Sequence, residues 1–224
     1  MGIDTLKAHE NQDRERYKLV NPIEYAELLN SSSEPVSLEE IGSSEVQYVI
    51  DEMMYIAAGK DKEGGAQMVG LAAPQIGILK QIAILDIAAT GQREKQEMIV
   101  LINPRIVEQS TDALVDGREG CWSCGDYCAN VPRLEWVIVE AFDRGGAPVR
   151  MRLDGFTARI AQHEIDHLGG VRCIDRVPLS EPERLHLVRK DDADEFNLYR
   201  ANWRDWQQTF PREEWERFRG GLTT

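Results

Sequence analysis

Long apolar runs are absent from this sequence of 224 residues. A membrane-spanning helix needs about 20 consecutive, mostly apolar residues, and no segment of the chain approaches that length, so none is predicted to cross a membrane. Basic residues are also in short supply, with 26 Lys and Arg against 39 Asp and Glu. The resulting net charge of −13 argues against direct nucleic-acid binding, because phosphate neutralisation requires a basic face.

The N-terminus lacks the apolar core of a secretory signal. Residues 1–16 form a polar leader of mixed charge, which also differs from an Arg-rich transit peptide. Internal repeats are absent, and the length suits one well-buried domain with a small appendage. The sequence therefore predicts a protein of the cytoplasm with one main domain.

Cysteine is scarce, with only four in the chain: Cys121, Cys124, Cys128 and Cys173. Cys121 and Cys124 form a C-x-x-C pair, which can be a redox pair or half of a zinc site. No second pair completes a four-cysteine zinc site, so we favour a metal-ligand role for Cys121. A neighbouring thiol could form a disulfide with Cys121, and this predicts sensitivity to oxygen.

Histidine is equally scarce, yet two of the four lie in one short segment, Gln162-His163-Glu164-Ile165-Asp166-His167. Residues four apart share a helix face, so His163 and His167 can bind one metal ion. Glu164 is placed to take a proton from a metal-bound water, as in the HExxH pattern of metal-dependent hydrolases. The alternative is an ordinary charged helix.

A catalytic metal needs a third protein ligand, and Cys121 is the best candidate. Its thiolate is a strong ligand for zinc or ferrous iron, whereas the alternative for a lone cysteine is a small buried apolar residue. That alternative leaves the metal with two ligands, which is too few for a stable catalytic site.

Three segments together resemble a known family. Glu119-Gly120-Cys121-Trp122-Ser123 is similar to the EGCxS motif of peptide deformylases, and residues 162–170 (QHEIDHLGG) are similar to their QHExDHxxG helix. Residues 69–75 (VGLAAPQ) resemble their GxGxAAxQ loop, although Met68 stands where the first glycine usually lies. The resemblance covers residues 17–177 and implies a catalytic domain of the α+β class. Antiparallel or mixed sheets would surround a central metal-binding helix.

The resemblance also implies a role for each matched residue. The chain would hold one divalent ion, usually ferrous iron and in prepared samples often zinc, nickel or cobalt. With this ion it would hydrolyse the formyl group from the N-terminal formyl-methionine of nascent, ribosome-associated polypeptides and release formate. The metal ligands would be Cys121, His163 and His167, with Glu164 as general base, Gln75 and the backbone N–H of Trp122 as oxyanion donors, and Val69, Gly70, Leu71 and Glu119 as substrate-binding residues.

Hydrophobic spacing predicts the main elements. Apolar residues recur at helical spacing before a polar, glycine-containing loop at residues 59–67. Two Gly residues follow the metal-binding segment and predict its end. The predicted elements are a helix at 45–58, strands at 82–87 and 98–107 (the second broken at Asn103-Pro104), a hairpin of 136–142 and 149–153, and a helix from Gly155 to Gly169.

Residues 178–224 form a C-terminal extension, which we expect to be largely helical and rich in tryptophan. Trp203, Trp206 and Trp215 lie in its last 22 residues. These rings are expected to pack the extension against the domain; the alternative is a docking surface, for example in a homodimer.

Three functions remain open. The chain is a peptide deformylase acting on formyl-methionyl chains, a specialised deformylase for another N-formyl compound, or a protein that binds formyl peptides without efficient turnover. Departures from the family at Met68, Trp122 and the segment from Cys124 to Cys128 predict an altered side-chain preference. The complete catalytic set argues against the third function.

Overall fold

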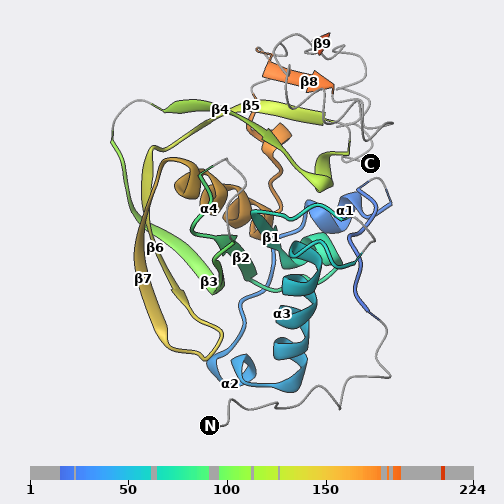
Figure 1. Ribbon diagram of the computed structural model, residues 1–224, viewed down its shortest axis with the longest axis vertical. Helices are drawn as coiled ribbons and strands as arrows, with labels where there is room; N and C mark the ends of the chain where they lie inside the picture. The colour runs from blue at the N-terminus through green and yellow to red at the C-terminus, as the bar shows by residue number, and fades with distance from the viewer. Residues whose placement is uncertain are drawn as a thin grey trace.

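Two antiparallel sheets enclose one long helix in the computed structural model (Figure 1). The structure describes residues 16–22, 24–61, 65–90, 96–111, 114–125, 127–177, 181, 184–187 and 208–209. The helix α4 (Gly155–Leu168) lies between the five-stranded sheet and the pair β4–β5. This arrangement confirms the predicted α+β class with a central metal-binding helix.

The five-stranded sheet has the order β1-β2-β3-β6-β7, and all its neighbouring strands are antiparallel. β2 is buried along its whole length, while β6 alternates between buried and half-buried side chains, as a strand with one face on the core should. The predicted hairpin is confirmed as β6 and β7. The strands are β1 (Gly70–Ala72), β2 (Ile82–Asp86), β3 (Met98–Gln109), β6 (Trp136–Phe142) and β7 (Pro148–Asp154).

The second sheet has the order β4-β5-β8-β9 and was not predicted. It comprises β4 (Val115–Gly120), β5 (Tyr127–Arg133), β8 (Leu185–Leu187) and β9 (Gln208–Thr209). β8 and β9 belong to the C-terminal extension, so the expectation of a helix is wrong at these residues, because their backbone pairs with β5 and with each other. The tryptophans of the extension lie outside the described residues.

The helix predicted at residues 45–58 is confirmed as α3 (Ser44–Ala57). The Ser43 side chain caps it by accepting a hydrogen bond from the Val46 N–H, and its inner face contributes Ile50, Met53 and Ile56 to the core. No helix in the described part of the chain is long and apolar enough to cross a membrane. The remaining helical segments are α1 (Ala26–Leu29), α2 (Leu38–Ile41), and the 3₁₀ turns η1 (Ala73–Ile76), η2 (Trp122–Cys124) and η3 (Cys173–Arg176).

The predicted break at Asn103-Pro104 is a change of register rather than the end of a strand. β3 continues through it, and its pairing with β6 shifts between Ile102 and Arg105. Asn103 takes a φ of 52°, which is rare for residues other than glycine. Its side chain accepts a hydrogen bond from the Val36 N–H at 2.8 Å and donates one to the Val36 carbonyl at 2.7 Å. The Asn103 side chain therefore connects the segment around Val36 to β3.

Replacing Asn103 should weaken this connection. Asn103→Ala loses both hydrogen bonds and strains the left-handed backbone, so we expect a loss of about 2–3 kcal/mol in the free energy of unfolding. Asn103→Gly loses the same bonds but tolerates the φ angle, so its loss should be smaller. Urea denaturation of both variants measures the difference, and equal losses would show that backbone strain contributes nothing.

Candidate active site

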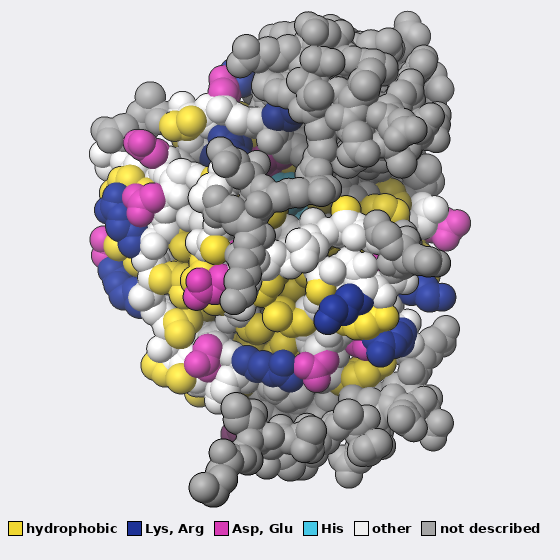
Figure 2. All heavy atoms as spheres, in the orientation of Figure 1, with side chains coloured by type: hydrophobic (Ala, Val, Ile, Leu, Met, Phe, Trp, Pro, Cys, Tyr) yellow, Lys and Arg dark blue, Asp and Glu magenta, His cyan; other side chains and the backbone are white. Residues whose placement is uncertain are grey.

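The three predicted metal ligands come together at one end of the cavity beside α4. His163 and His167 share a face of α4, with ring centroids 4.9 Å apart. The Cys121 Sγ atom lies 3.1 Å from His167 Nε2, and one potential ligand atom from each of the three residues lies within 4.8 Å of the others. In Figure 2 the histidine side chains appear only as a small recessed area. Two imidazoles and one thiolate in this arrangement fit a divalent transition metal.

Cys121 is held where β4 ends. Its neighbour Gly120 pairs with Cys128 on β5, and Cys121 itself precedes the turn η2, whose Cys124 N–H donates to the Cys121 carbonyl. A strand end followed by a tight turn fixes the thiol opposite α4. The sequence predicted the ligand but neither of the strands that position it.

Glu119 orients the imidazole ring of His163 through its Nδ1 atom. Its Oε2 lies 2.9 Å from His163 Nδ1, so the second ring nitrogen, Nε2, is left for the metal. Arg133 contacts both oxygens of this carboxylate, at 2.9 and 2.8 Å. Burial opposes ionisation, but the bonds from Arg133 and His163 outweigh it and keep the Glu119 pKa well below its ordinary value. The sequence predicted Glu119 as a substrate-binding residue, and it lines the cavity; its contacts in addition orient the His163 ring.

Arg133 continues the network to a second buried carboxylate. Its Nη1 donates to Asp166 Oδ2 at 2.5 Å, and the Arg176 Nε donates to the same oxygen at 2.8 Å. Arg133, Glu119 and Asp166 are all buried. The sequence did not predict these roles, because its only signal was an arginine ending an apolar stretch, and its partners are distant along the chain.

Glu164 fits against the backbone of β1. A Cβ atom added to Gly70 would lie 2.4 Å from the Glu164 Oε1 atom, so the carboxylate requires a glycine there. The side chain is buried, and within the described residues nothing donates a hydrogen bond to its Oε2. Burial raises the Glu164 pKa to about 8. A carboxyl group in this state can take up and return a proton near neutral pH.

Gln75 presents its amide nitrogen to the same centre. The Ala72 N–H donates to Gln75 Oε1 at 2.8 Å, which orients the amide so that its Nε2 donates to Cys121 Sγ at 3.4 Å. If Gln75 only ended a turn, its side chain would not need to be buried or to point at Cys121. Trp122 lies beside it with a half-exposed ring whose Nε1 donates to the Val20 carbonyl at 3.2 Å.

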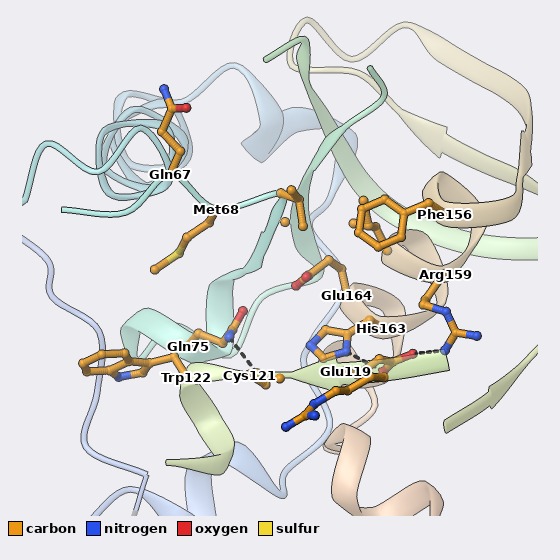
Figure 3. Close-up of a pocket in the computed structure, with 15 residues that line it drawn as sticks. Gln67, Met68, Gln75, Glu119, Cys121, Trp122, Phe156, Arg159, His163 and Glu164 are labelled. Atoms are coloured by element: carbon orange, nitrogen blue, oxygen red, sulfur yellow. Dashed lines mark hydrogen bonds and ion pairs between the residues drawn. The ribbon is translucent and has the colours of Figure 1, made fainter. Parts of the chain in front are cut away.

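A cavity of about 350 Å³ opens between these groups (Figure 3). Its catalytic end is polar and its remaining wall is largely apolar. Of the three residues predicted at 69–71 to bind substrate, Val69 and Gly70 lie on the wall, whereas Leu71 is fully buried and does not line the cavity. The lining residues are Gln67, Met68, Val69, Gly70, Gln75, Arg118, Glu119, Gly120, Cys121, Trp122, Phe156, Arg159, Ile160, His163 and Glu164.

The other cysteines are buried around the site without forming disulfides. Cys124 Sγ lies 3.4 Å from Cys173 Sγ, and Cys128 Sγ accepts a hydrogen bond from Arg118 Nη2 at 2.9 Å. Burial raises the pKa of the Cys124 thiol, which disfavours the reactive thiolate. Cys173 also lies within 4.8 Å of ligand atoms of Glu119 and His163, so it is a competing candidate for a metal ligand.

Comparison with known proteins decides the family. The sequence profile of the family described as polypeptide deformylase matches residues 9–183. The chain belongs to the polypeptide deformylase family. Deformylases remove the N-formyl group from newly made polypeptides, and this family member is accordingly a metal-dependent amide hydrolase that acts on N-formyl peptides.

Several deformylases are similar to it along most of their length. A peptide deformylase of Thermodesulfovibrio yellowstonii is 39% identical over 168 residues, which are 73% of this chain and 90% of that protein. Peptide deformylase 2 of Vibrio vulnificus is 39% identical over 146 residues, 65% of this chain and 80% of the relative.

Solved deformylase structures share the fold. The Synechococcus elongatus enzyme in complex with actinonin superposes with a TM-score of 0.61 at 34% identity, covering 74% of this chain and 83% of that one. The class I type b enzyme of Acinetobacter baumannii with bound Met-Ala-Ser gives a TM-score of 0.60 at 32% identity, covering 67% and 92% of the two chains. The antiparallel sheets around an HExxH helix are therefore those of a deformylase.

Removing Arg133 should destabilise this deformylase strongly. Arg133→Met leaves two buried carboxylates without their main partner, which typically costs about 3–5 kcal/mol of unfolding free energy. Arg105→Met is the matched control, because Arg105 is exposed and, among the described residues, forms its ion pair with the half-buried Glu140; it should change stability by less than about 0.5 kcal/mol.

The stability of the protein should depend on pH, because the Glu119 pKa is lowered in the folded state. A carboxyl with a depressed folded-state pKa stabilises the protein above its ordinary value of 4.5 and loses that contribution as the pH falls. The difference in urea midpoint between wild type and Arg133→Met should therefore shrink below about pH 4.5. A constant difference down to the acid transition would contradict this assignment.

Proposed function

We propose that Cys121, His163 and His167 bind one divalent ion, ferrous iron in the cell, and that Glu164 and Gln75 carry out formyl hydrolysis beside it. The observation that carries this proposal is the position of the Glu164 carboxylate, which lies next to the three ligands in space left by Gly70. A bound ion would supply Lewis acidity that lowers the pKa of water from about 15.7 to near 7. Zinc, nickel or cobalt would suit the same nitrogen and sulfur ligands.

Glu164 would carry the proton. It accepts the proton of the attacking water, and it then donates that proton to the amide nitrogen as the bond between the formyl carbon and the nitrogen breaks. The second proton of the water leaves with the formic acid and passes to the released amine, so formate and a protonated amino terminus result, and atoms and charge balance. A buried carboxyl with a pKa of about 8 is suited to both halves of this transfer.

Gln75 would stabilise the charge that develops on the formyl oxygen. Its amide is held by the Ala72 N–H and directed at the ligand cluster, so no reorganisation is needed during the reaction. The backbone N–H of Trp122, which follows the ligand Cys121, would be the second donor. Loss of one such donor typically lowers the rate by about 10²- to 10³-fold.

The peptide would add to the sheet as a further strand. β1 is the edge strand of the five-stranded sheet, because it pairs with β2 on one side only. An exposed edge supplies backbone donors and acceptors to an extended peptide. Val69 and Gly70 lie at this edge and on the cavity wall, while Leu71 would contribute through its backbone alone.

The natural substrate would be the formyl-methionyl end of nascent chains at the ribosome in the cytoplasm. A specialised N-formyl substrate is the second candidate, because the Met68 and Trp122 side chains enter the cavity wall where they depart from the family pattern. A panel of formyl dipeptides that differ only in the first side chain tests both through kcat/KM. A strong preference for formyl-Met supports nascent chains, and a preference for another side chain supports the specialised substrate.

Cys121→Ala should remove most of the tightly bound metal, because it deletes one of three protein ligands. Cys173→Ala is the matched control, since Cys173 is also a buried thiol near His163. Elemental analysis of both purified variants measures the metal per chain. Metal lost from Cys173→Ala and kept by Cys121→Ala would reverse the assignment.

Glu164→Gln should keep the metal but lower kcat by about 10²- to 10⁴-fold, because only the proton carrier is removed. Gly70→Ala should also lower kcat with the metal retained, since its Cβ would displace the Glu164 carboxylate. Gly42→Ala is the control, because a Cβ there meets no atom within 4 Å. Wild-type kcat in Glu164→Gln would exclude this mechanism.

A further inference from the structure

An arginine forms part of the cavity wall next to its apolar residues. Arg159 lies on α4, one turn before the ligand His163, and Phe156 and Ile160 share its side of the helix. Figure 3 shows Phe156 and Arg159 on one side of the cavity and Met68 on the other. A first side chain that enters this cavity would therefore meet a guanidinium as well as apolar groups.

The Arg159 guanidinium is fixed rather than free to move. Its Nη1 donates to Glu119 Oε1 at 2.7 Å, to the Val131 carbonyl at 2.8 Å and to the Gly117 carbonyl at 3.2 Å. Its Nη2 donates to the Val115 carbonyl at 2.7 Å. Four bonds to the strands of the second sheet hold the group at the wall.

Gly117 provides the space for this group. A Cβ atom at Gly117 would lie 2.5 Å from the Arg159 Cζ atom and 2.7 Å from its Nε. The guanidinium thus occupies the volume that a side chain on β4 would fill. The Nε–H of Arg159 has no acceptor among the described residues, in contrast to Nη1 and Nη2.

The carboxylates beside Arg159 do not balance all the guanidinium groups that surround them. The Glu119 carboxylate that Arg159 contacts is shared with Arg133 and His163. Arg133 pairs with Asp166 as well, and Asp166 is in turn shared with Arg176, so two carboxylates face the three guanidinium groups of this network. A donor with residual positive charge in a mostly apolar cavity favours an acceptor in the ligand and disfavours a purely apolar end group.

We propose that Arg159 determines which first side chain the cavity accepts, and that it favours an unbranched side chain ending in a hydrogen-bond acceptor over an apolar one of similar length. This inference rests on the proposed function, because it assigns the cavity to the first residue of a formyl peptide. A cavity with a fixed donor rejects a substrate that leaves the donor without a partner.

The test compares formyl-glutaminyl-alanine with formyl-norleucyl-alanine, whose first side chains are both unbranched and similar in length. The measured quantity is the ratio of their kcat/KM values, which does not depend on the fraction of active enzyme. The wild-type enzyme should process the glutaminyl peptide at least as well as the norleucyl peptide. A wild-type preference of more than tenfold for norleucine overturns the proposal without any variant.

Arg159→Met should lower the glutamine-to-norleucine ratio by about tenfold, because it replaces the donor with an apolar chain of similar length. Arg176→Met is the matched control, since Arg176 holds the buried Asp166 but does not line the cavity, and its ratio should stay at the wild-type value. An unchanged ratio in Arg159→Met, or an equal fall in both variants, overturns the proposal. Absence of formate release from the glutaminyl, norleucyl and methionyl peptides alike would instead overturn the proposed function, whereas release from the glutaminyl peptide alone would support this inference.

Discussion

Arg133 lies between two buried carboxylates, Glu119 at the end of β4 and Asp166 in the last turn of α4. An unpaired charge in a protein interior is costly, so these three groups are stable only when strand and helix are both in place. Glu119 in turn fixes the ring of His163, and Asp166 precedes His167 by one residue. The ion pairs that hold the second sheet to α4 therefore also set the direction of the His163 ring, and the geometry of this proposed ligand depends on the packing of the whole domain.

The five-stranded sheet contributes to the other side of the centre. Its edge strand β1 brings Gly70 against Glu164, and the following turn η1 brings Gln75 to Cys121. The proposed metal ligands thus come from α4 and the end of β4, whereas the proposed oxyanion donor and peptide-binding edge come from η1 and β1. The cavity lies where the two sheets meet the same helix, and this explains why the proton carrier is buried while the substrate still has access.

Much of this arrangement could be predicted from the sequence. The spacing of His163 and His167 requires one helix face, and the periods of α3 and the β6–β7 hairpin follow from burial on one side. The continuous apolar run of β2 follows from burial along its whole length. β4 could not be predicted, because its segment Val115–Gly120 is polar and contains two glycines, and its strand conformation comes from pairing with β5. The partners of Arg133 were equally hidden, since they lie 14 and 33 residues away and no local pattern specifies such pairs.

Gly117 and Arg159 occupy neighbouring space although they lie 42 residues apart. A side chain at position 117 and a guanidinium from position 159 compete for the same volume, so neither position is free to change alone. A bulky apolar residue at 117 requires a shorter one at 159, and the exchange would replace the guanidinium in the wall with an apolar group of similar shape. Residues 117 and 159 are therefore expected to change together among related proteins. Substrate range can change by a paired replacement on β4 and α4 that leaves every metal ligand, and the fold around them, as it was.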